Sequence, residues 1–305
     1  MDVSVIIVNY NTLALTQQCV DSIFEKTSGL DFEVIIVDNG STDGSKEVFS
    51  IDSRIQYIYS EENLGFGRAN NLGATHAKGV YLFFLNSDTY LVNNAICLLW
   101  KEMSHLNQKN AKVACAGCLL TDERGEMIHS YARFPGKFRS LMESTIYPVL
   151  WKLHVISQMP TTSNDDAHLH PESCFKVDYV TGADLMVRKA VADQLGLFDP
   201  DFFMYFEETE MQYRYRKAGY ASIICRDPKI VHLEGKSNRK SSPSRSTQAM
   251  RSKFLYFKKT TNPLVYHLFA LILKLGYVLT YLLTFMFVHG ETRQKFDHLK
   301  AVMVM

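Results

Sequence analysis

The 305-residue sequence predicts an α/β fold, a mostly parallel sheet flanked by helices, followed by an apolar helical segment at the C-terminal end. Two observations predict the sheet: apolar runs of strand length alternate with stretches of helical periodicity, and short polar clusters follow these runs. A third observation predicts the helical segment, because residues 264–288 contain a single formal charge, on Lys274.

The first half of the chain supplies most of the predicted sheet. Its predicted strands are apolar runs bounded by glycine or polar residues: 3–8, 32–37, 55–59 and 80–85. Its predicted helices have apolar residues three or four positions apart: 13–25, a short helix from 45, 63–77 and 94–106. Helical crossovers between parallel strands are right-handed, and the polar clusters after the strands should gather along one edge of the sheet.

The second half is less regular. Its predicted strands are 113–120, 176–180, 221–225 and 230–232, and its predicted helices are 189–195 and a helix from Glu207 that Gly219 ends. Residues 125–147 give no clear prediction. The polar stretch 157–173 predicts a mobile surface loop, in which we interpret Asp165, Asp166, His168 and His170 as solvated side chains rather than metal ligands.

The composition changes near the C-terminus, which predicts three parts: an α/β domain over 1–235, a basic linker over 236–262, and amphipathic or apolar helices over 263–305. The apolar run is long enough to span a bilayer, but His267 and Lys274 recur on one helical stripe and Gly276 could divide the run. We favour a helix lying in the interface of an anionic membrane. The alternatives are a true membrane span, a buried helix and a dimer face, so the oligomeric state stays open.

Charge and cysteine content exclude some classes of protein. The net charge of +1 gives no basis for a nucleic-acid partner. The six cysteines are scattered without the framework of a small disulfide-rich domain, which predicts a reducing compartment, and Cys115 and Cys118 are interpreted as core thiols. The N-terminal residues lack the pattern of a secretory signal.

Four polar clusters carry the predicted chemistry: Asn9 to Asn11, Asp38 to Gly44, Asn86 to Asp88, and Glu207 to Glu210. A carboxylate after a strand, as at Asp38, can accept hydrogen bonds from a nucleobase or a ribose hydroxyl. Asp88 can hold Mg²⁺ or Mn²⁺, which prefer oxygen ligands and bridge phosphates. One glutamate of the last cluster could take a proton from an attacking hydroxyl, although acids in a first helical turn also stabilise the helix dipole.

These clusters resemble family 2 glycosyltransferases of the GT-A fold, closest to a rhamnosyltransferase-like branch. The resemblance covers about residues 1–260 and rests on seven stretches: Val5 to Asn11, Val37 to Gly44, Glu62 to Gly67 with Asn70 and Asn71, Leu85 to Asp88, Thr181 to Ala183, Phe206 to Glu208, and His232 to Gly235. It implies inverting transfer of a sugar, with rhamnose as a candidate, from a nucleotide diphosphate donor.

The resemblance also implies roles for individual residues. Asp38 matches the residue that recognises the base, Asp88 the metal ligand and His232 a histidine that can complete the metal site. Donor contacts are expected at Asn9, Asp38, Gly65, Arg68 and Asn86, with Arg68 on the pyrophosphate or simply solvated on its helix; acceptor or sugar contacts are expected at Gly182, Ala183 and Glu210.

The general base is expected at Glu208, where the family usually has an aspartate, and the catalytic pair is Glu207 and Glu208. The choice among Glu207, Glu208 and Glu210 stays open, because glutamate is one methylene longer.

The sequence therefore predicts a hexosyltransferase that uses Mg²⁺ or Mn²⁺ and a saccharide or lipid-linked saccharide acceptor in cell-surface polysaccharide synthesis. We expect it in the cytoplasm, attached to the cytoplasmic face of the membrane. The alternatives are a nucleotidyltransferase of similar fold, which would usually need a basic glycine-rich loop that residues 8–12 lack, and a non-catalytic membrane scaffold.

Overall fold

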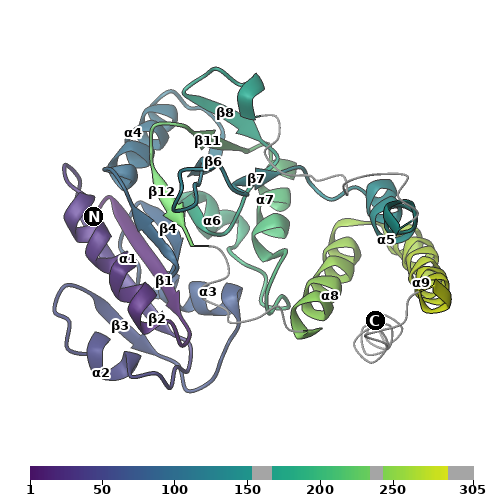
Figure 1. Ribbon diagram of the computed structural model, residues 1–305. Helices are drawn as coiled ribbons and strands as arrows, with labels where there is room; N and C mark the ends of the chain where they lie inside the picture. Colours follow the sequence, from purple (N-terminus) through teal and green to yellow (C-terminus); the bar gives the residue numbers. More distant parts are fainter. Residues whose placement is uncertain (153–166, 234–242, 288–305) are drawn as a thin grey trace. The chain divides into compact units, whose positions relative to one another are not determined.

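The computed structural model describes residues 1–152, 167–233 and 243–287 (Figure 1). The chain divides into two compact units. The first comprises residues 1–133, 163–203 and 207–240, and the second comprises 134–162, 204–206 and 241–305. Residues 134–162, expected within the α/β domain, therefore group with the C-terminal helices. Most of the loop predicted over 157–173, including Asp165 and Asp166, lies outside the described residues.

The first unit is built on an eight-stranded sheet in the order β3-β2-β1-β4-β10-β6-β11-β8. Its strands are β1 (Val3–Asn9), β2 (Phe32–Asp38), β3 (Gln56–Tyr59), β4 (Tyr81–Asn86), β6 (Val113–Cys118), β8 (Cys174–Val177), β10 (Asp184–Arg188) and β11 (Ala221–Cys225). β1, β2, β3 and β4 run parallel, as do β6 and β11, whereas β10 and β8 are antiparallel to their neighbours. The prediction of a mostly parallel sheet flanked by helices is confirmed.

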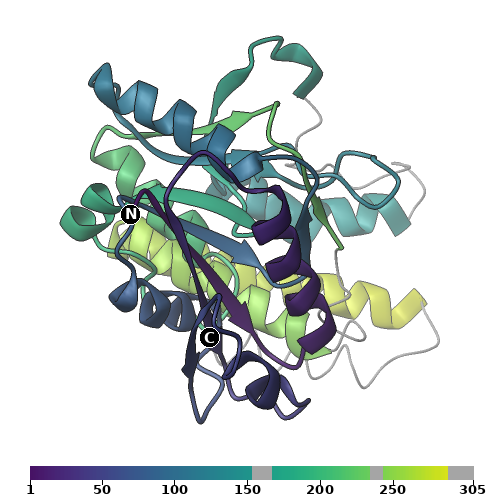
Figure 2. The ribbon, with the colours of Figure 1, turned by 90° about the vertical axis from the view of Figure 1, so that its left-hand side faces the viewer.

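Helices cover both faces of this sheet because alternate strand residues are apolar on each side. In β1, Val5 and Ile7 pack in one core with α1, α2 and α4, while Ile6 packs in the other with α3, α6 and α7 (Figure 1). The bounds of these helices are α1 (Leu13–Lys26), α2 (Ser45–Phe49), α3 (Phe66–His76), α4 (Ala95–Gln108), α6 (Lys189–Leu195) and α7 (Glu207–Lys217). Figure 2 views the face that α1 covers.

Strand register brings the polar clusters to one edge of the sheet. Asn9 of β1 pairs with Asp38 of β2, and Val8 pairs with Asn86 of β4. Two short ladders add to this edge: β5 (Thr89–Leu91) pairs with β12 (Ile230–His232), and β7 (Tyr131–Ala132) pairs with β9 (Tyr179–Val180). In the first ladder His232 lies opposite Thr89, next to Asp88.

In the part of the second unit that the structure describes, there are three long helices: α5 (Lys137–Lys152), α8 (Pro243–Thr260) and α9 (Pro263–Phe287). α5 was not predicted, because residues 125–147 gave no clear pattern, and the helix continues through Pro148. The expected linker forms helix α8, and α9 continues through Gly276 instead of dividing there. Within the described ranges, no helix combines the length and apolarity needed to cross a bilayer.

The cysteines differ in part from the prediction. Cys115 and Cys118 are buried free thiols in β6, as expected, and Cys19 and Cys97 are also buried and free. Cys174 and Cys225, however, form a disulfide between β8 and β11. These two residues are directly opposite in the antiparallel ladder, a register that the scattered spacing of the cysteines did not reveal.

Candidate active site

A buried hydrogen-bond network joins the ends of β1, β2 and β4. The side chain of Asn9 is fully buried, and its amide nitrogen donates to Ser41 Oγ at 3.0 Å. Its amide oxygen accepts from the hydroxyl groups of Thr12 at 2.9 Å and Thr16 at 2.8 Å. The Thr12 hydroxyl also lies 3.1 Å from Ser87 Oγ, which places the turn that carries Asp88 on the same network. Asn9 therefore fixes three strand ends relative to one another.

Asp38 lies at the end of β2, between Asn9 of β1 and Tyr59 of β3, and we call the pair of Asn9 and Asp38 the β1–β2 corner. Its carboxylate is fully buried and accepts a hydrogen bond from the Ser41 amide at 2.8 Å and another from the Tyr57 hydroxyl at 2.8 Å. Burial, together with the neighbouring carboxylate, raises the pKa of Tyr57 above its usual value, so the tyrosine stays a donor. Each Asp38 oxygen thus has an internal donor.

The turn before α3 requires a glycine. Gly65 has φ +82°, and a Cβ atom there would lie 2.1 Å from the carbonyl oxygen of Phe203. The Phe66 amide donates to that same oxygen at 2.8 Å, and Arg68 Nε donates to the Pro200 carbonyl at 2.6 Å. Arg68 therefore helps to tie α3 to the 198–203 segment.

Asp88 and His232 meet at the ladder of β5 and β12. Asp88 Oδ1 lies 3.2 Å from His232 Nε2, with side-chain exposures of 4% and 14%. The backbone holds both in place, since the Leu233 amide donates to the Asp88 carbonyl at 2.8 Å and the His232 amide donates to Thr121 at 2.9 Å.

This pair fits part of a divalent-cation site. A carboxylate oxygen and an imidazole nitrogen suit Mn²⁺, and Mg²⁺ commonly takes one or two carboxylates and completes its shell with water and substrate phosphates. Within the described residues, no group of three or more His, Cys, Asp or Glu side chains could enclose a metal ion. Asp88 and His232 could therefore supply only part of the coordination shell of a divalent cation, and the phosphate oxygens of a diphosphate would have to complete it.

Asp184 is a second buried carboxylate on this side of the sheet. It is fully buried in β10, and its Oδ2 accepts from the Cys118 amide at 2.6 Å. Burial raises its pKa to about 7, opposed by this hydrogen bond and by the electrostatic effect of His232. Burial thus favours the neutral form of Asp184, and this carboxyl lies close enough to His232 for their charges to interact.

The three glutamates of the first turn of α7 have different surroundings. Glu208 is partly exposed; burial raises its pKa, and its Oε1 accepts from the Thr209 hydroxyl at 3.1 Å. Glu207 is buried and lies against Gly67, where an added Cβ would be 3.5 Å from the Glu207 side chain. The carboxylate of Glu210 is buried and ion-paired with Arg214, whose NH2 group lies 2.9 Å from Oε2.

Arg214 shows that Glu210 supports the fold. The guanidinium also donates to the carbonyl groups of Leu195, Gly196 and Leu197, so it caps the end of α6. Glu208 combines a pKa raised by burial with a partly exposed side chain, which suits a proton acceptor.

Gly182 and Ala183 connect the two sides of the site. The Ala183 carbonyl accepts from the Asn86 amide at 3.0 Å. A Cβ atom at Gly182 would lie 3.9 Å from Glu208 Cγ and 3.3 Å from the Phe66 ring. Asn86 and Glu208 therefore flank one short stretch of backbone, and both side chains are partly exposed.

The segment before α7 holds unusual backbone conformations. Tyr205 and Phe206 both have φ +69°, in a region that bulky residues rarely adopt. Within the second unit, the Ser252 hydroxyl of α8 donates to the Met204 carbonyl at 2.7 Å, and the rings of Phe206 and Tyr256 are 5.7 Å apart. Glu207 follows Phe206 directly in the chain.

Comparison with known proteins assigns the family. Residues 4–155 match the model described as glycosyl transferase family 2. The chain belongs to glycosyl transferase family 2. The matched segment contains Asn9, Asp38, Gly65, Arg68, Asn86 and Asp88. The residues on the other side of the site, including Glu208 and His232, lie beyond it.

Several relatives of this family 2 glycosyltransferase are themselves named as sugar transferases. The chain is 27% identical over 235 residues to the low-salt glycan biosynthesis hexosyltransferase Agl10 of Haloferax volcanii, a match that covers 76% of this chain and 67% of Agl10. It is 25% identical to the N-acetylglucosaminyl-diphospho-decaprenol L-rhamnosyltransferase of Mycobacterium tuberculosis, covering 73% of each chain. It is 31% identical to glycosyltransferase GlyG of Streptococcus pneumoniae over 42% of this chain and 43% of GlyG.

Solved structures share the GT-A fold. The mannosyltransferase PcManGT from Pyrobaculum calidifontis, in complex with GDP-Man and Mn²⁺, has a TM-score of 0.57 at 14% identity, covering 99% of this chain and 86% of that one. GalNAc-T7 with UDP, GalNAc and Mn²⁺ has a TM-score of 0.58 at 18% identity, covering 87% and 52%.

Several residues of the candidate site were given no individual role in the sequence prediction, although Ser41 and Ser87 lie within two of its polar clusters. They are the hydroxyl residues Thr12, Ser41 and Ser87, the phenol of Tyr57, and Asp184. One signal was available: Asp184 is a charged residue that opens an apolar strand two residues after Gly182. The hydroxyl network had no such signal, because serine and threonine are ordinary turn residues.

Proposed function

We propose that this family 2 glycosyltransferase transfers a sugar, with rhamnose as the first candidate, from a nucleoside diphosphate sugar to an acceptor hydroxyl with inversion at the anomeric carbon. One observation carries the mechanism: Glu208, whose pKa is raised by burial, flanks the same Gly182–Ala183 backbone as Asn86, two residues before Asp88. This arrangement supports a reaction in which Glu208 acts from one side of that backbone and the diphosphate leaves on the other.

In the proposed reaction the Glu208 carboxylate takes the proton of the acceptor hydroxyl. The acceptor oxygen forms a bond to the anomeric carbon while the bond from that carbon to the phosphate oxygen breaks, and the nucleoside diphosphate leaves with the electron pair. Mg²⁺ or Mn²⁺ held by Asp88 and His232 would supply positive charge to the leaving diphosphate. Asn86 and the corner formed by Asn9 and Asp38 orient the donor. Arg68 and Gly65 shape the turn beside them.

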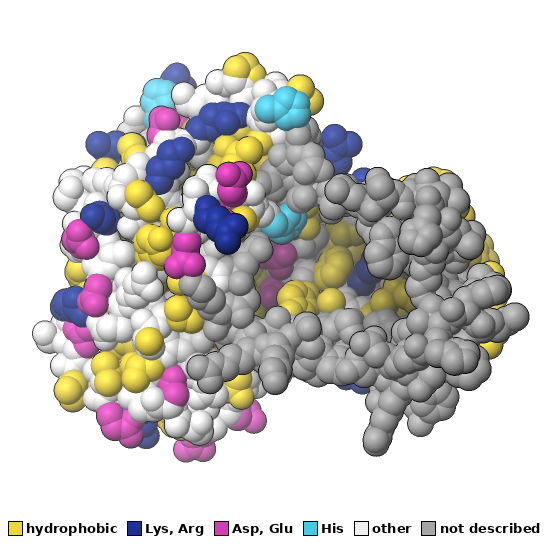
Figure 3. All heavy atoms as spheres, viewed as in Figure 1, with side chains coloured by type: hydrophobic (Ala, Val, Ile, Leu, Met, Phe, Trp, Pro, Cys, Tyr) yellow, Lys and Arg dark blue, Asp and Glu magenta, His cyan; other side chains and the backbone are white. Residues whose placement is uncertain are grey.

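The acceptor proposal follows the relatives. The mycobacterial relative is named for a saccharide attached to diphospho-decaprenol, and Agl10 for glycan biosynthesis. We therefore propose a saccharide or lipid-linked saccharide acceptor in cell-surface polysaccharide synthesis, with the enzyme on the cytoplasmic face of the membrane. We propose no nucleic-acid partner, in keeping with the net charge of +1. Lys/Arg and Asp/Glu side chains are interspersed on the visible face of the first unit (Figure 3).

The test is a screen of nucleoside diphosphate sugars with Mn²⁺, in which release of free nucleoside diphosphate is measured with and without saccharide acceptors. Acceptor-dependent release from one donor, and an anomeric configuration in the product opposite to that of the donor, is the expected result. Release of inorganic diphosphate would instead identify a nucleotidyltransferase. No release from any donor, with the protein folded, would overturn the proposal.

A further inference from the structure

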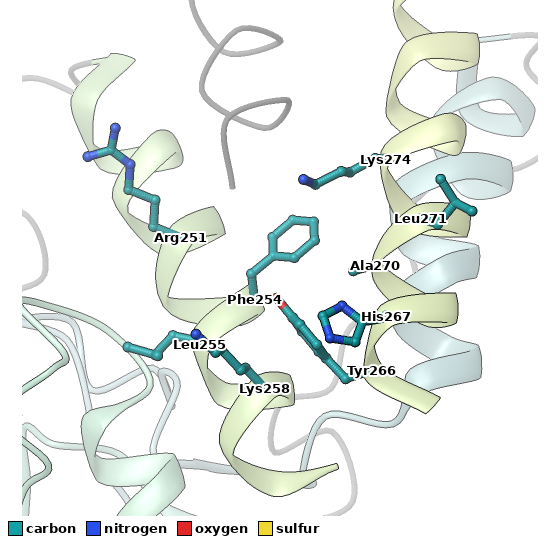
Figure 4. A pocket seen from close by; sticks show the side chains of 9 residues that line it. All are labelled: Arg251, Phe254, Leu255, Lys258, Tyr266, His267, Ala270, Leu271 and Lys274. Carbon is teal, nitrogen blue, oxygen red and sulfur yellow. The ribbon is translucent and has the colours of Figure 1, made fainter. Parts of the chain in front are cut away.

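A cavity of about 490 Å³ lies between α8 and α9 in the second unit (Figure 4). Its walls come from both helices: Arg251, Phe254, Leu255 and Lys258 of α8, with Tyr266, His267, Ala270, Leu271 and Lys274 of α9. In Figure 4 the Phe254 ring projects between the helices, and Lys274 extends from α9 toward α8. None of these residues belongs to the glycosyltransferase site described above.

The charge of the cavity has one sign. Three of its lining residues, Arg251, Lys258 and Lys274, are cations, and none is an acid. The neighbouring Lys253 of α8 is different, because its ammonium lies 3.4 Å from the Glu143 carboxylate of α5. The Glu143 carboxylate thus pairs with a lysine outside the cavity. A cavity that combines a guanidinium, ammonium groups and aromatic walls is complementary to a phosphate ester.

The outer surface of α9 indicates where that phosphate comes from. Large apolar side chains, each more than half exposed, follow one another at intervals of three or four residues: Leu264, Leu268, Leu271, Leu275, Leu279 and Leu282. Such spacing places them along one face of the helix. Leu271 belongs to both this face and the cavity, so the apolar surface continues into the cationic site.

We propose that this cavity binds the phosphate headgroup of an anionic membrane lipid while the apolar face of α9 contacts the acyl chains. A helix with an exposed apolar face and flanking cations binds an anionic leaflet through both effects. The inference deepens the membrane attachment in the proposed function, and it is independent of the sugar-transfer chemistry.

The test is sedimentation of the full-length protein with vesicles. Wild type should bind phosphatidylcholine vesicles that contain phosphatidylglycerol at least about tenfold more tightly than pure phosphatidylcholine vesicles. Arg251→Gln combined with Lys258→Gln should remove most of this preference. The matched control is Lys137→Gln combined with Lys259→Gln, which neutralises two exposed cations of the same unit outside the cavity and should change binding less than about twofold.

Three outcomes would overturn the inference. Equal losses in the two double variants would show that general surface charge binds the vesicles. Equal binding of wild type to both kinds of vesicle would show that the apolar face of α9 alone binds the membrane and that the cavity does not recognise an anionic headgroup. Saturable binding of inorganic phosphate or diphosphate without vesicles, at the affinity seen for the lipid, would identify a soluble anion as the ligand.

Turnover on a soluble acceptor separates this inference from the proposed function. The cavity variant should release nucleoside diphosphate at the wild-type rate when donor and soluble acceptor are both in solution. Normal turnover with lost vesicle binding supports the inference. Absent turnover in wild type would count against the proposed function and leave the vesicle result intact.

Discussion

Two groups of buried and half-buried polar residues lie on the two sides of the site, and they differ in their hydrogen-bond and ionic partners. At the β1–β2 corner, Asn9 and Asp38 are held by hydroxyl and amide donors that keep their protons at neutral pH. On the β4–α7 side, Asp88 faces an imidazole, and the pKa values of Asp184 and Glu208 are raised by burial. Burial of a polar side chain in this site therefore has two different effects. At the β1–β2 corner it holds a loop in one conformation, and on the β4–α7 side it raises the pKa of a carboxyl group.

The largest expected effect is on kcat, for a substitution at Glu208 on the β4–α7 side. Glu208→Gln should lower kcat by about 10²–10⁴-fold with little change in donor affinity, because it removes a general base. The measurement is nucleoside diphosphate release at saturating donor and acceptor, together with donor binding by calorimetry.

The matched control is Glu210→Gln, the same substitution two residues further along α7. It weakens the ion pair with Arg214 and should lower the thermal midpoint while kcat stays within a few-fold of wild type. If Glu210→Gln abolished turnover in folded protein and Glu208→Gln did not, the assignment of the base would be reversed.

Asp88→Asn should have the next largest effect, on metal dependence. The amide loses the negative charge that attracts a divalent cation, so the Mn²⁺ concentration for half-maximal turnover should rise and kcat should fall by about 10²-fold or more. A Mn²⁺ titration of the rate measures both. The exposed Asp193, paired with Lys189 on α6, gives the control Asp193→Asn, which should leave the titration unchanged. An unchanged titration for Asp88→Asn would remove this residue as a metal ligand.

The same comparison explains how much the sequence could predict. Apolar runs and strand-end polarity predict β1, β2 and β4 and the meeting of Asn9, Asp38 and Asn86, because parallel register aligns strand ends. The contact between Asp88 and His232 could be expected only from resemblance, since the two residues are 144 positions apart and the β5–β12 ladder is non-local.

Other features depend on packing that a sequence pattern does not encode. The pairing of Glu210 with Arg214 has the spacing of neighbours on a helix, but only the position of α6 shows that Arg214 also caps another helix. Helix α5 contains Pro148, and its local sequence argues against a helix. The cationic cavity needs two helices, although the spacing of His267 and Lys274 already marked one polar stripe.

Asp184→Asn tests the pH dependence of the β4–α7 side. The pKa of Asp184 is about 7 in the folded protein and near 3.8 when unfolded, so folding favours the protonated form. The carboxyl therefore contributes most to stability below pH 4, and that contribution is lost as pH rises toward 7. Relative to Asp184→Asn, the free energy of unfolding of wild type should fall by roughly 2–3 kcal/mol between pH 5 and pH 8.

Urea unfolding of both proteins in the presence of a chelator measures this difference without a bound cation. An asparagine can still accept the hydrogen bond from the Cys118 amide, so the comparison isolates the charge. Parallel pH profiles for the two proteins would mean that Asp184 ionises normally, and the contrast between the two regions would then rest on Glu208 and His232.

Tyr57→Phe should have the smallest effect, on stability at the β1–β2 corner. It removes the hydroxyl that donates to Asp38 Oδ2 and leaves a buried carboxylate oxygen without that donor, which should cost about 1–3 kcal/mol of unfolding free energy. If the corner only fixes the 38–44 turn, kcat and the donor KM should change together and by less than about threefold at temperatures well below unfolding. A donor KM lowered several-fold at constant kcat would instead mean that Asp38 binds the nucleoside directly, because the donor would no longer have to displace the phenol from it.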